Sequence, residues 1–118
     1  MDQGIKQKSR QFAAKVVILH KQLSARKKES VMSEELLRSG AGVGATLVKS
    51  EFPMGKNDQT AKTYEALQDC AEARYWLELL NETGYLTEFE FSDTMKECIE
   101  LGNLLMARIK AIAAAASK

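Results

Sequence analysis

With 118 residues, 45% of them hydrophobic, and only one proline, the chain is the size of one helical domain whose core needs neither disulfides nor a metal. Seventeen lysines and arginines against 16 acids give a net charge of +1, which excludes a molecule dominated by one electrostatic field. The polar, basic N-terminus and the lack of any apolar run of about eighteen residues argue against a signal peptide and a transmembrane helix. We therefore expect a cytoplasmic protein.

The first predicted helix runs from about residue 5 to residue 24. Its inward residues recur at heptad spacing, the pattern of a helix with one buried face. They are Ile5, Ser9, Phe12, Val16, Leu19 and Leu23. Val17 and Ile18 make the same helix apolar on a second face, which one neighbouring layer does not require. We therefore expect Val17 and Ile18 to belong to a subunit interface.

The second predicted helix spans about residues 34–51. Ser33 is its predicted N-cap, with Ser30 as the competing cap, because a serine hydroxyl can accept a hydrogen bond from a free N–H of the first turn. Each glycine in a helix costs about 1 kcal/mol relative to alanine. The three glycines near the middle of this segment therefore leave a loop over residues 39–45 as the alternative.

The apolar pattern nevertheless continues through these glycines and favours an unbroken helix. It is carried by Val43, Leu47 and Val48. A glycine-containing helix recovers its low propensity where another backbone approaches closely. We therefore predict that Gly42 and Gly44 lie at a close helix contact.

The third predicted helix, about residues 59–82, follows a break that contains the single proline. Gly84 is its predicted C-cap, because glycine adopts the left-handed conformation that ends many helices. Within this helix Tyr75 and Trp76 are adjacent and cannot both face one core. We expect Tyr75 to serve an interface.

Thr87 and Glu90 form a capping box ahead of the fourth predicted helix, about residues 88–115. Its inner residues follow alternating steps of four and three, as in a helical bundle. They are Phe91, Met95, Cys98, Gly102, Leu105, Ile109 and Ile112. Short connections between four helices predict antiparallel neighbours. The prediction is one all-α domain over residues 1–118, an up-down-up-down four-helix bundle.

Two stretches of the chain resemble one bacterial family, the four-helix-bundle proteins encoded in intervening sequences of 23S rRNA genes. LLRSGAGVGATLVKSE (36–51) is similar to the family's second helix, and ALQDCAEARYWLELLNETGYLTEFEF (66–91) to its third helix, turn and fourth helix. The resemblance marks a helix-packing motif of Arg38, Ser39, Gly42, Gly44 and Ala45. The chain departs from the family pattern at Gly42, Thr46 and Lys49, where a small polar residue, asparagine and glutamate are usual.

This family is similar to the accessory proteins of diversity-generating retroelements, which form pentameric barrels and bind nucleic acid and a reverse transcriptase. The resemblance implies a homo-oligomer, with a pentamer as the expected state, and RNA or DNA as a ligand. The alternative is a structural scaffold for a protein partner, such as a reverse transcriptase, without direct binding of nucleic acid.

Basic residues gather at the N-terminus, where the first 28 positions hold eight lysines and arginines and one acid. Such asymmetry predicts phosphate-led binding of nucleic acid. The predicted contacts are Lys8, Lys15, Arg26, Lys27 and Lys28. The alternative is a solvated face whose charges pair with acids of the third helix.

No residue pattern indicates catalysis. His20 is the single histidine, whereas a di-iron bundle needs two Glu-x-x-His motifs. The GAGVG segment lacks the Lys-Ser/Thr that completes a phosphate-binding loop. Cys70 and Cys98 are expected to be reduced core residues. We expect no enzyme, no metal and no cofactor.

Overall fold

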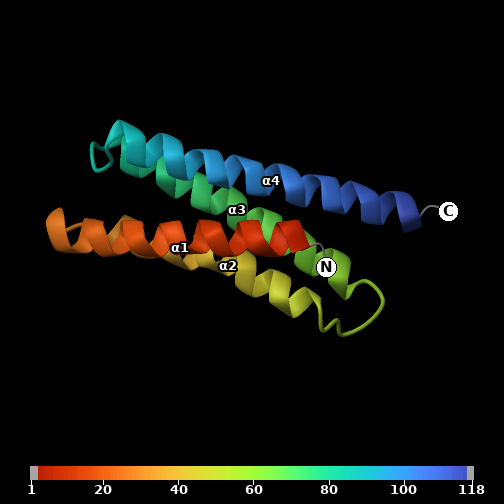
Figure 1. The fold of residues 1–118 in the computed structure, drawn as a ribbon. Helices are drawn as coiled ribbons and strands as arrows, with labels where there is room; N and C mark the ends of the chain where they lie inside the picture. Colours follow the sequence, from red (N-terminus) through yellow and green to blue (C-terminus); the bar gives the residue numbers. More distant parts are fainter. Residues whose placement is uncertain (1–2, 117–118) are drawn as a thin grey trace.

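The computed structural model describes residues 3–116, which form four α-helices packed side by side (Figure 1). The helices are α1 (Gln3–Arg26), α2 (Val31–Ser50), α3 (Asp58–Glu82) and α4 (Glu88–Ala116). Neighbours in sequence run in opposite directions, which confirms the predicted antiparallel four-helix bundle. The packing order is α1–α2–α3–α4 and back to α1, so α1 lies diagonally opposite α3.

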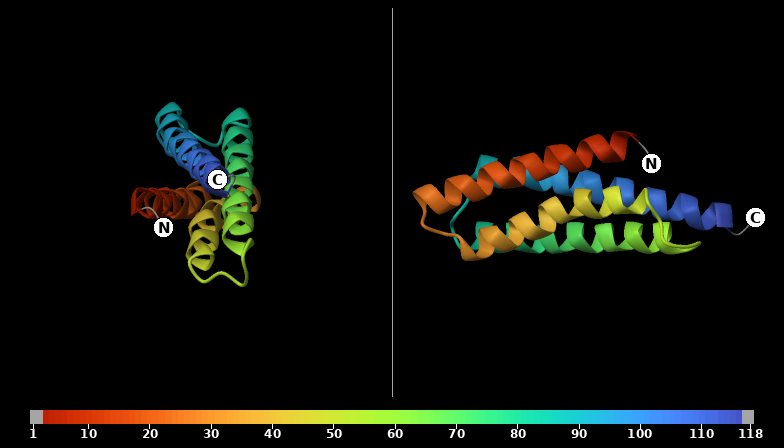
Figure 2. Two further views of the ribbon diagram at one scale, coloured as in Figure 1. Left: turned by 90° about the vertical axis from the view of Figure 1, so that its right-hand side faces the viewer. Right: turned by 90° about the horizontal axis from the view of Figure 1, so that it is seen from below.

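The bundle is a rod of 52 × 23 × 21 Å. One end of the rod carries the start of α1, the α2–α3 loop and the end of α4 (Figure 2). The other end carries the α1–α2 and α3–α4 loops. Of the four contacts between neighbouring helices, α2–α3 is the most extensive and α1–α4 the least.

The core follows the predicted stripes in large part, although Leu101 of α4 is fully buried outside its predicted stripe and Val48 of α2 is exposed. All six inward residues expected in the first helix are buried, including Ser9. Cys70 of α3 and Cys98 of α4 are buried as predicted, with their Sγ atoms 3.9 Å apart. Each thiol lies near the other residue's carbonyl oxygen, at 3.4 and 3.5 Å, so both sulfurs have a hydrogen-bond acceptor within the core.

The start of α2 differs from the prediction. The helix begins at Val31, three residues earlier than expected, and the assignment of Ser33 as N-cap is wrong. The Glu29 carboxylate instead accepts hydrogen bonds from the backbone N–H groups of Met32 and Ser33, at 3.0 and 2.9 Å. A glutamate side chain is long enough to reach the free N–H groups of the first turn from outside the helix. Ser33 is buried and contacts His20 Nδ1 at 2.8 Å.

The junction between α3 and α4 follows the prediction closely. Gly84 has φ +84°, and hydrogen bonds run from its N–H to the Asn81 carbonyl (3.1 Å) and from the next N–H to the Leu80 carbonyl (3.0 Å). This pair of bonds is the Schellman motif. The Thr87 N–H donates to the Glu90 carboxylate at 2.9 Å, and the Glu90 N–H donates to the Thr87 hydroxyl at 3.1 Å, so the capping box is confirmed.

Candidate binding surfaces

Two of the five predicted phosphate-binding cations lie against α4. Lys8 Nζ is 2.6 Å from Glu100 and 3.2 Å from Glu97, and Lys15 Nζ is 2.7 Å from Asp93. The hydrogen bond from Lys8 lowers the pKa of the Glu100 carboxyl. In return, the hydrogen bonds to Glu100 and Glu97 raise the pKa of Lys8. The acids that neutralise this face of α1 therefore come from α4, whereas the alternative interpretation expected them from the third helix.

The other three cations follow one another at the end of α1. Arg26, Lys27 and Lys28 are all exposed, and none forms an ion pair with any part of the chain that the structure describes. Lys28 has φ +57°, a left-handed conformation that turns the chain sharply. The Leu23 carbonyl accepts hydrogen bonds from the N–H groups of Lys27 and Glu29, each at 3.1 Å. This turn presents a basic cluster, Arg26–Lys28, at one end of the rod.

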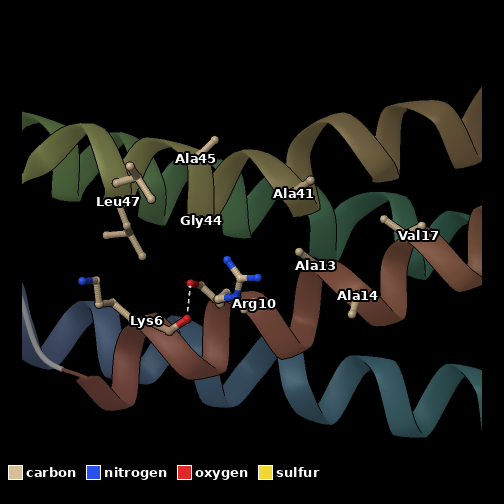
Figure 3. A pocket seen from close by; sticks show the side chains of 11 residues that line it. Lys6, Arg10, Ala13, Ala14, Val17, Ala41, Gly44, Ala45 and Leu47 are labelled. Carbon is tan, nitrogen blue, oxygen red and sulfur yellow. Dashed lines mark hydrogen bonds between the residues drawn. The ribbon is translucent and has the colours of Figure 1, made fainter.

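A groove of about 500 Å³ lies between α1 and α2 on the outside of the bundle (Figure 3). Its walls are mostly small or apolar, with Lys6 and Arg10 at one end. The small and apolar lining residues include Ala13, Ala14, Val17, Ala41, Gly44 and Ala45. Ile18 on α1 and Val48 on α2 are 55% and 53% exposed. The predicted interface residue Val17 therefore lines an apolar groove that residues 3–116 leave open, and Ile18 is an exposed apolar side chain of the same helix.

The residues of the helix-packing motif point in different directions. Arg38 is exposed and forms ion pairs with Glu35, at 3.0 Å, and with Glu72 of α3. The Ser39 hydroxyl is buried and donates to the Glu35 carbonyl at 2.8 Å. Ala45 is exposed. The motif therefore combines contacts to α3 with part of the open groove.

Gly42 and Gly44, which were predicted to lie at a close helix contact, have neighbours at ordinary van der Waals distances. A Cβ added at Gly42 would lie 3.5 Å from Asp69 Oδ2 of α3, and one added at Gly44 would lie 3.4 Å from Ser9 Oγ of α1. Thr46, one of the departures from the family pattern, donates to the same Asp69 oxygen at 3.3 Å. Burial raises the pKa of the Asp69 carboxyl, and the bond from Thr46 partly opposes that shift.

Gly40, which the sequence analysis did not identify, has the closest contact to a neighbouring helix among the glycines of α2. A Cβ there would lie 3.0 and 3.2 Å from the two methyl groups of Val16. Gly40 belongs to the buried stripe of α2: counted from Leu36, the next members are Gly40, Val43 and Leu47, at four, seven and eleven residues. That spacing was the available signal, because a glycine inside an apolar stripe faces the neighbouring helix.

Tyr75 lies on a different side of the molecule from Val17 and Ile18, because α3 is diagonally opposite α1. Its ring is 56% exposed and meets Trp76 edge to face, with ring centroids 5.0 Å apart. The Trp76 indole N–H donates to Glu72 at 2.9 Å and is half-buried, so Tyr75 is the member of the pair that faces solvent.

Neither a metal site nor a membrane span occurs within residues 3–116. No group of three or more His, Cys, Asp or Glu side chains in that range is placed to hold a metal ion. None of the four helices is long and apolar enough to cross a membrane.

Comparison with known proteins agrees with the resemblance seen in the sequence. The family model of the 23S rRNA-intervening sequence protein matches residues 1–107. The chain belongs to this family. The family match extends from α1 through most of α4, so it includes both the groove and the basic cluster.

A crystal structure from Bacteroides thetaiotaomicron is similar to this member of the 23S rRNA-intervening sequence family. It is described as a protein of unknown function from the S23 ribosomal protein family. The two chains are 38% identical, with a TM-score of 0.87, over 90% of this chain and 98% of the other. No curated protein matches the chain.

Proposed function

We propose that this protein is a non-enzymatic, homo-oligomeric bundle that binds RNA or DNA phosphates through the basic cluster. The observation that carries the proposal is the run of Arg26, Lys27 and Lys28, exposed and without ion pairs among residues 3–116. Uncompensated cations at one end of a rigid rod can each neutralise a phosphate. Lys8 and Lys15 contribute less, because α4 acids already neutralise them.

Binding through this cluster is expected to depend strongly on salt and little on sequence. Three phosphate contacts per subunit give a slope of about −2.7 for log K against log salt, or about 40-fold weaker binding for a fourfold rise in salt. The cluster contains no aromatic side chain on which a base could stack. Phosphate contacts carry no direct sequence information.

Fluorescence anisotropy with a labelled RNA and a labelled duplex DNA, across a salt series, tests this proposal. The double variant Lys27→Glu/Lys28→Glu should weaken binding at least about tenfold, because it replaces two phosphate contacts by repulsion. The matched control Lys56→Glu/Lys110→Glu makes the same charge change with exposed lysines near the other end of the rod. It should change affinity far less. Absence of binding by the wild-type oligomer at low salt would contradict the proposal.

Self-association is the second part of the proposal, supported by the groove that residues 3–116 leave open and by the exposed Ile18 of α1. The family resemblance makes a pentamer the expected state. Light scattering at micromolar concentration should therefore give five times the chain mass of 13.1 kDa. A monomer under those conditions would contradict this part of the proposal.

A scaffold that binds a protein partner without nucleic acid is the second candidate function. The apolar lining of the groove favours it, because small and apolar side chains suit a helix from another protein. The Lys27→Glu/Lys28→Glu variant separates the two functions, since a partner seated in the groove should be insensitive to charge at the end of the rod.

A further inference from the structure

The charges of this bundle are divided between two helices that lie diagonally apart. α1 carries six lysines and arginines and no acid. α3 carries six acids and two bases. Because α1 packs against α2 and α4, its cations do not meet α3 within one chain. Lys6 pairs with Glu51, and Lys8 and Lys15 pair with acids of α4. The α1 cations left without an ion pair within residues 3–116 are Arg10, Lys21 and Arg26. Complementary charge on surfaces that do not meet within a chain favours a contact between chains.

The cations closest to the α1–α2 groove show this surplus. Lys6 pairs with Glu51 at 3.0 Å, whereas Arg10 is exposed and has no ion pair within residues 3–116. Arg10 lines the groove (Figure 3). The groove is therefore an apolar trough with a net positive end.

The exposed side of α3 offers a surface of matching size. Tyr64, Gln68, Ala71 and Tyr75 recur at steps of four, three and four, and all are exposed. This Tyr64–Tyr75 stripe carries no charge, and its two tyrosines are 49% and 56% exposed. Eleven residues of helix rise about 16 Å, which is also the rise from Lys6 to Val17 along the groove.

We propose that the α1–α2 groove receives the Tyr64–Tyr75 stripe of a second copy of this chain. The inference rests on the self-association proposed above and names the two surfaces that make the contact. Small groove residues such as Ala14 and Gly44 leave room for the tyrosine rings. The net negative charge of α3, six acids against two bases, complements Arg10 of the groove, which has no ion pair within residues 3–116.

The contact is heterologous, because the groove and the stripe are different surfaces on different helices. Head-to-tail contacts of this kind close into rings when the rotation between copies allows. The predicted interface residues Val17 and Tyr75 thus belong to the two halves of one contact.

Photocrosslinking of the full chain tests this pairing. A benzophenone amino acid replaces Ala14, which is exposed and lines the groove, and crosslinked peptides are identified by mass spectrometry. The expected crosslinks join residue 14 to the Tyr64–Tyr75 stripe of another chain. Crosslinks to α1, α2 or α4 of another chain, or none in a chain that light scattering shows to be oligomeric, would overturn the inference and leave self-association standing.

A pair of variants tests it independently. Tyr75→Asp should weaken self-association at least tenfold, because it places a charge in the apolar contact. Met106→Asp makes a comparable change at an exposed apolar residue of α4, and its oligomer should persist. Equal effects of the two variants would overturn the inference. Loss of nucleic-acid binding by Lys27→Glu/Lys28→Glu, with the crosslinks unchanged, would concern the proposed function alone.

Discussion

At the scale of single residues, Gly40 and Gly42 of α2 have different environments. Gly40 faces fully buried side chains of α1, where even a methyl group would meet Val16 at 3.0 Å. Gly42 faces a carboxylate of α3 at 3.5 Å. The helix thus uses one glycine for a close approach of α1, while Gly42 retains room for a side-chain methyl.

Alanine substitutions distinguish these environments. Gly42→Ala should raise the free energy of unfolding by up to about 1 kcal/mol, because alanine has the higher helix propensity. Gly40→Ala should lower it, because overpacking a filled core costs about 1–3 kcal/mol and exceeds that gain. Urea unfolding followed by far-UV circular dichroism measures both values. A Gly40→Ala variant as stable as Gly42→Ala would contradict the close approach of α1 and α2.

At the scale of elements, ion pairs join α1 to α4 at the edge of the core. The contact includes ion pairs of Lys8 with Glu97 and Glu100 and of Lys15 with Asp93. These pairs are only partly shielded from solvent, so we expect α4 to release α1 more readily than α2 does. This makes the α1–α4 contact the part of the bundle that responds most to acid.

The pKa of Glu100 determines the direction of that response. Its folded-state pKa is lowered from the ordinary value of 4.5, chiefly by the hydrogen bond from Lys8. The carboxylate therefore stabilises the fold above about pH 4.5, and this contribution is lost as the pH falls through the lower folded-state pKa. Unfolding free energies of wild type and Glu100→Gln should differ at neutral pH and converge in acid.

The control for this measurement is Glu82→Gln, which removes an exposed carboxylate of α3 outside the α1–α4 contact. It leaves the ion pairs of Lys8 intact and should leave the stability at neutral pH close to that of wild type. If the difference between wild type and Glu100→Gln stayed constant from neutral pH to about pH 3, the Lys8 pair would have no role in acid sensitivity.

At the scale of the whole molecule, residues 3–116 leave two extended surfaces open: the mostly apolar α1–α2 groove, which has Lys6 and Arg10 at one end, and the uncharged Tyr64–Tyr75 stripe. An oligomer that covers both is stabilised by mass action, because association draws on the folded chain alone. The stability of this protein should therefore depend on its concentration.

Calorimetry at two protein concentrations about a hundredfold apart measures this dependence. The midpoint of thermal unfolding should rise with concentration for the wild type. It should be nearly independent of concentration for Tyr75→Asp, whose contact surface is interrupted. A wild-type midpoint that does not move would indicate that the folded unit is the single bundle.

Local patterns in the sequence predicted most of the fold. The capping box at Thr87 and Glu90 and the left-handed Gly84 depend on residues within one turn of each other, so their chemistry is visible in sequence order. The continuity of α2 through its glycines followed from apolar spacing together with the family resemblance. The competing cap, Ser30, does hold the N-cap position of α2, but its side chain makes no capping hydrogen bond. The role of Glu29 escaped prediction, because glutamate is not a residue type usually assigned to capping.

The sequence by itself determined the four helices, the buried stripe of each and the basic surplus of the first one, because helix periodicity and charge are properties of the chain. Only the tertiary structure decided which cations remain uncompensated. Lys8 is neutralised by acids 89 and 92 residues away, whereas Lys27 and Lys28 are not paired within residues 3–116. The tertiary structure also determined that Gly40 lies at the close contact with α1 and that α1 and α3 are diagonally opposite. These outcomes depend on which helix faces meet in space, and that is settled by packing all four stripes into one core.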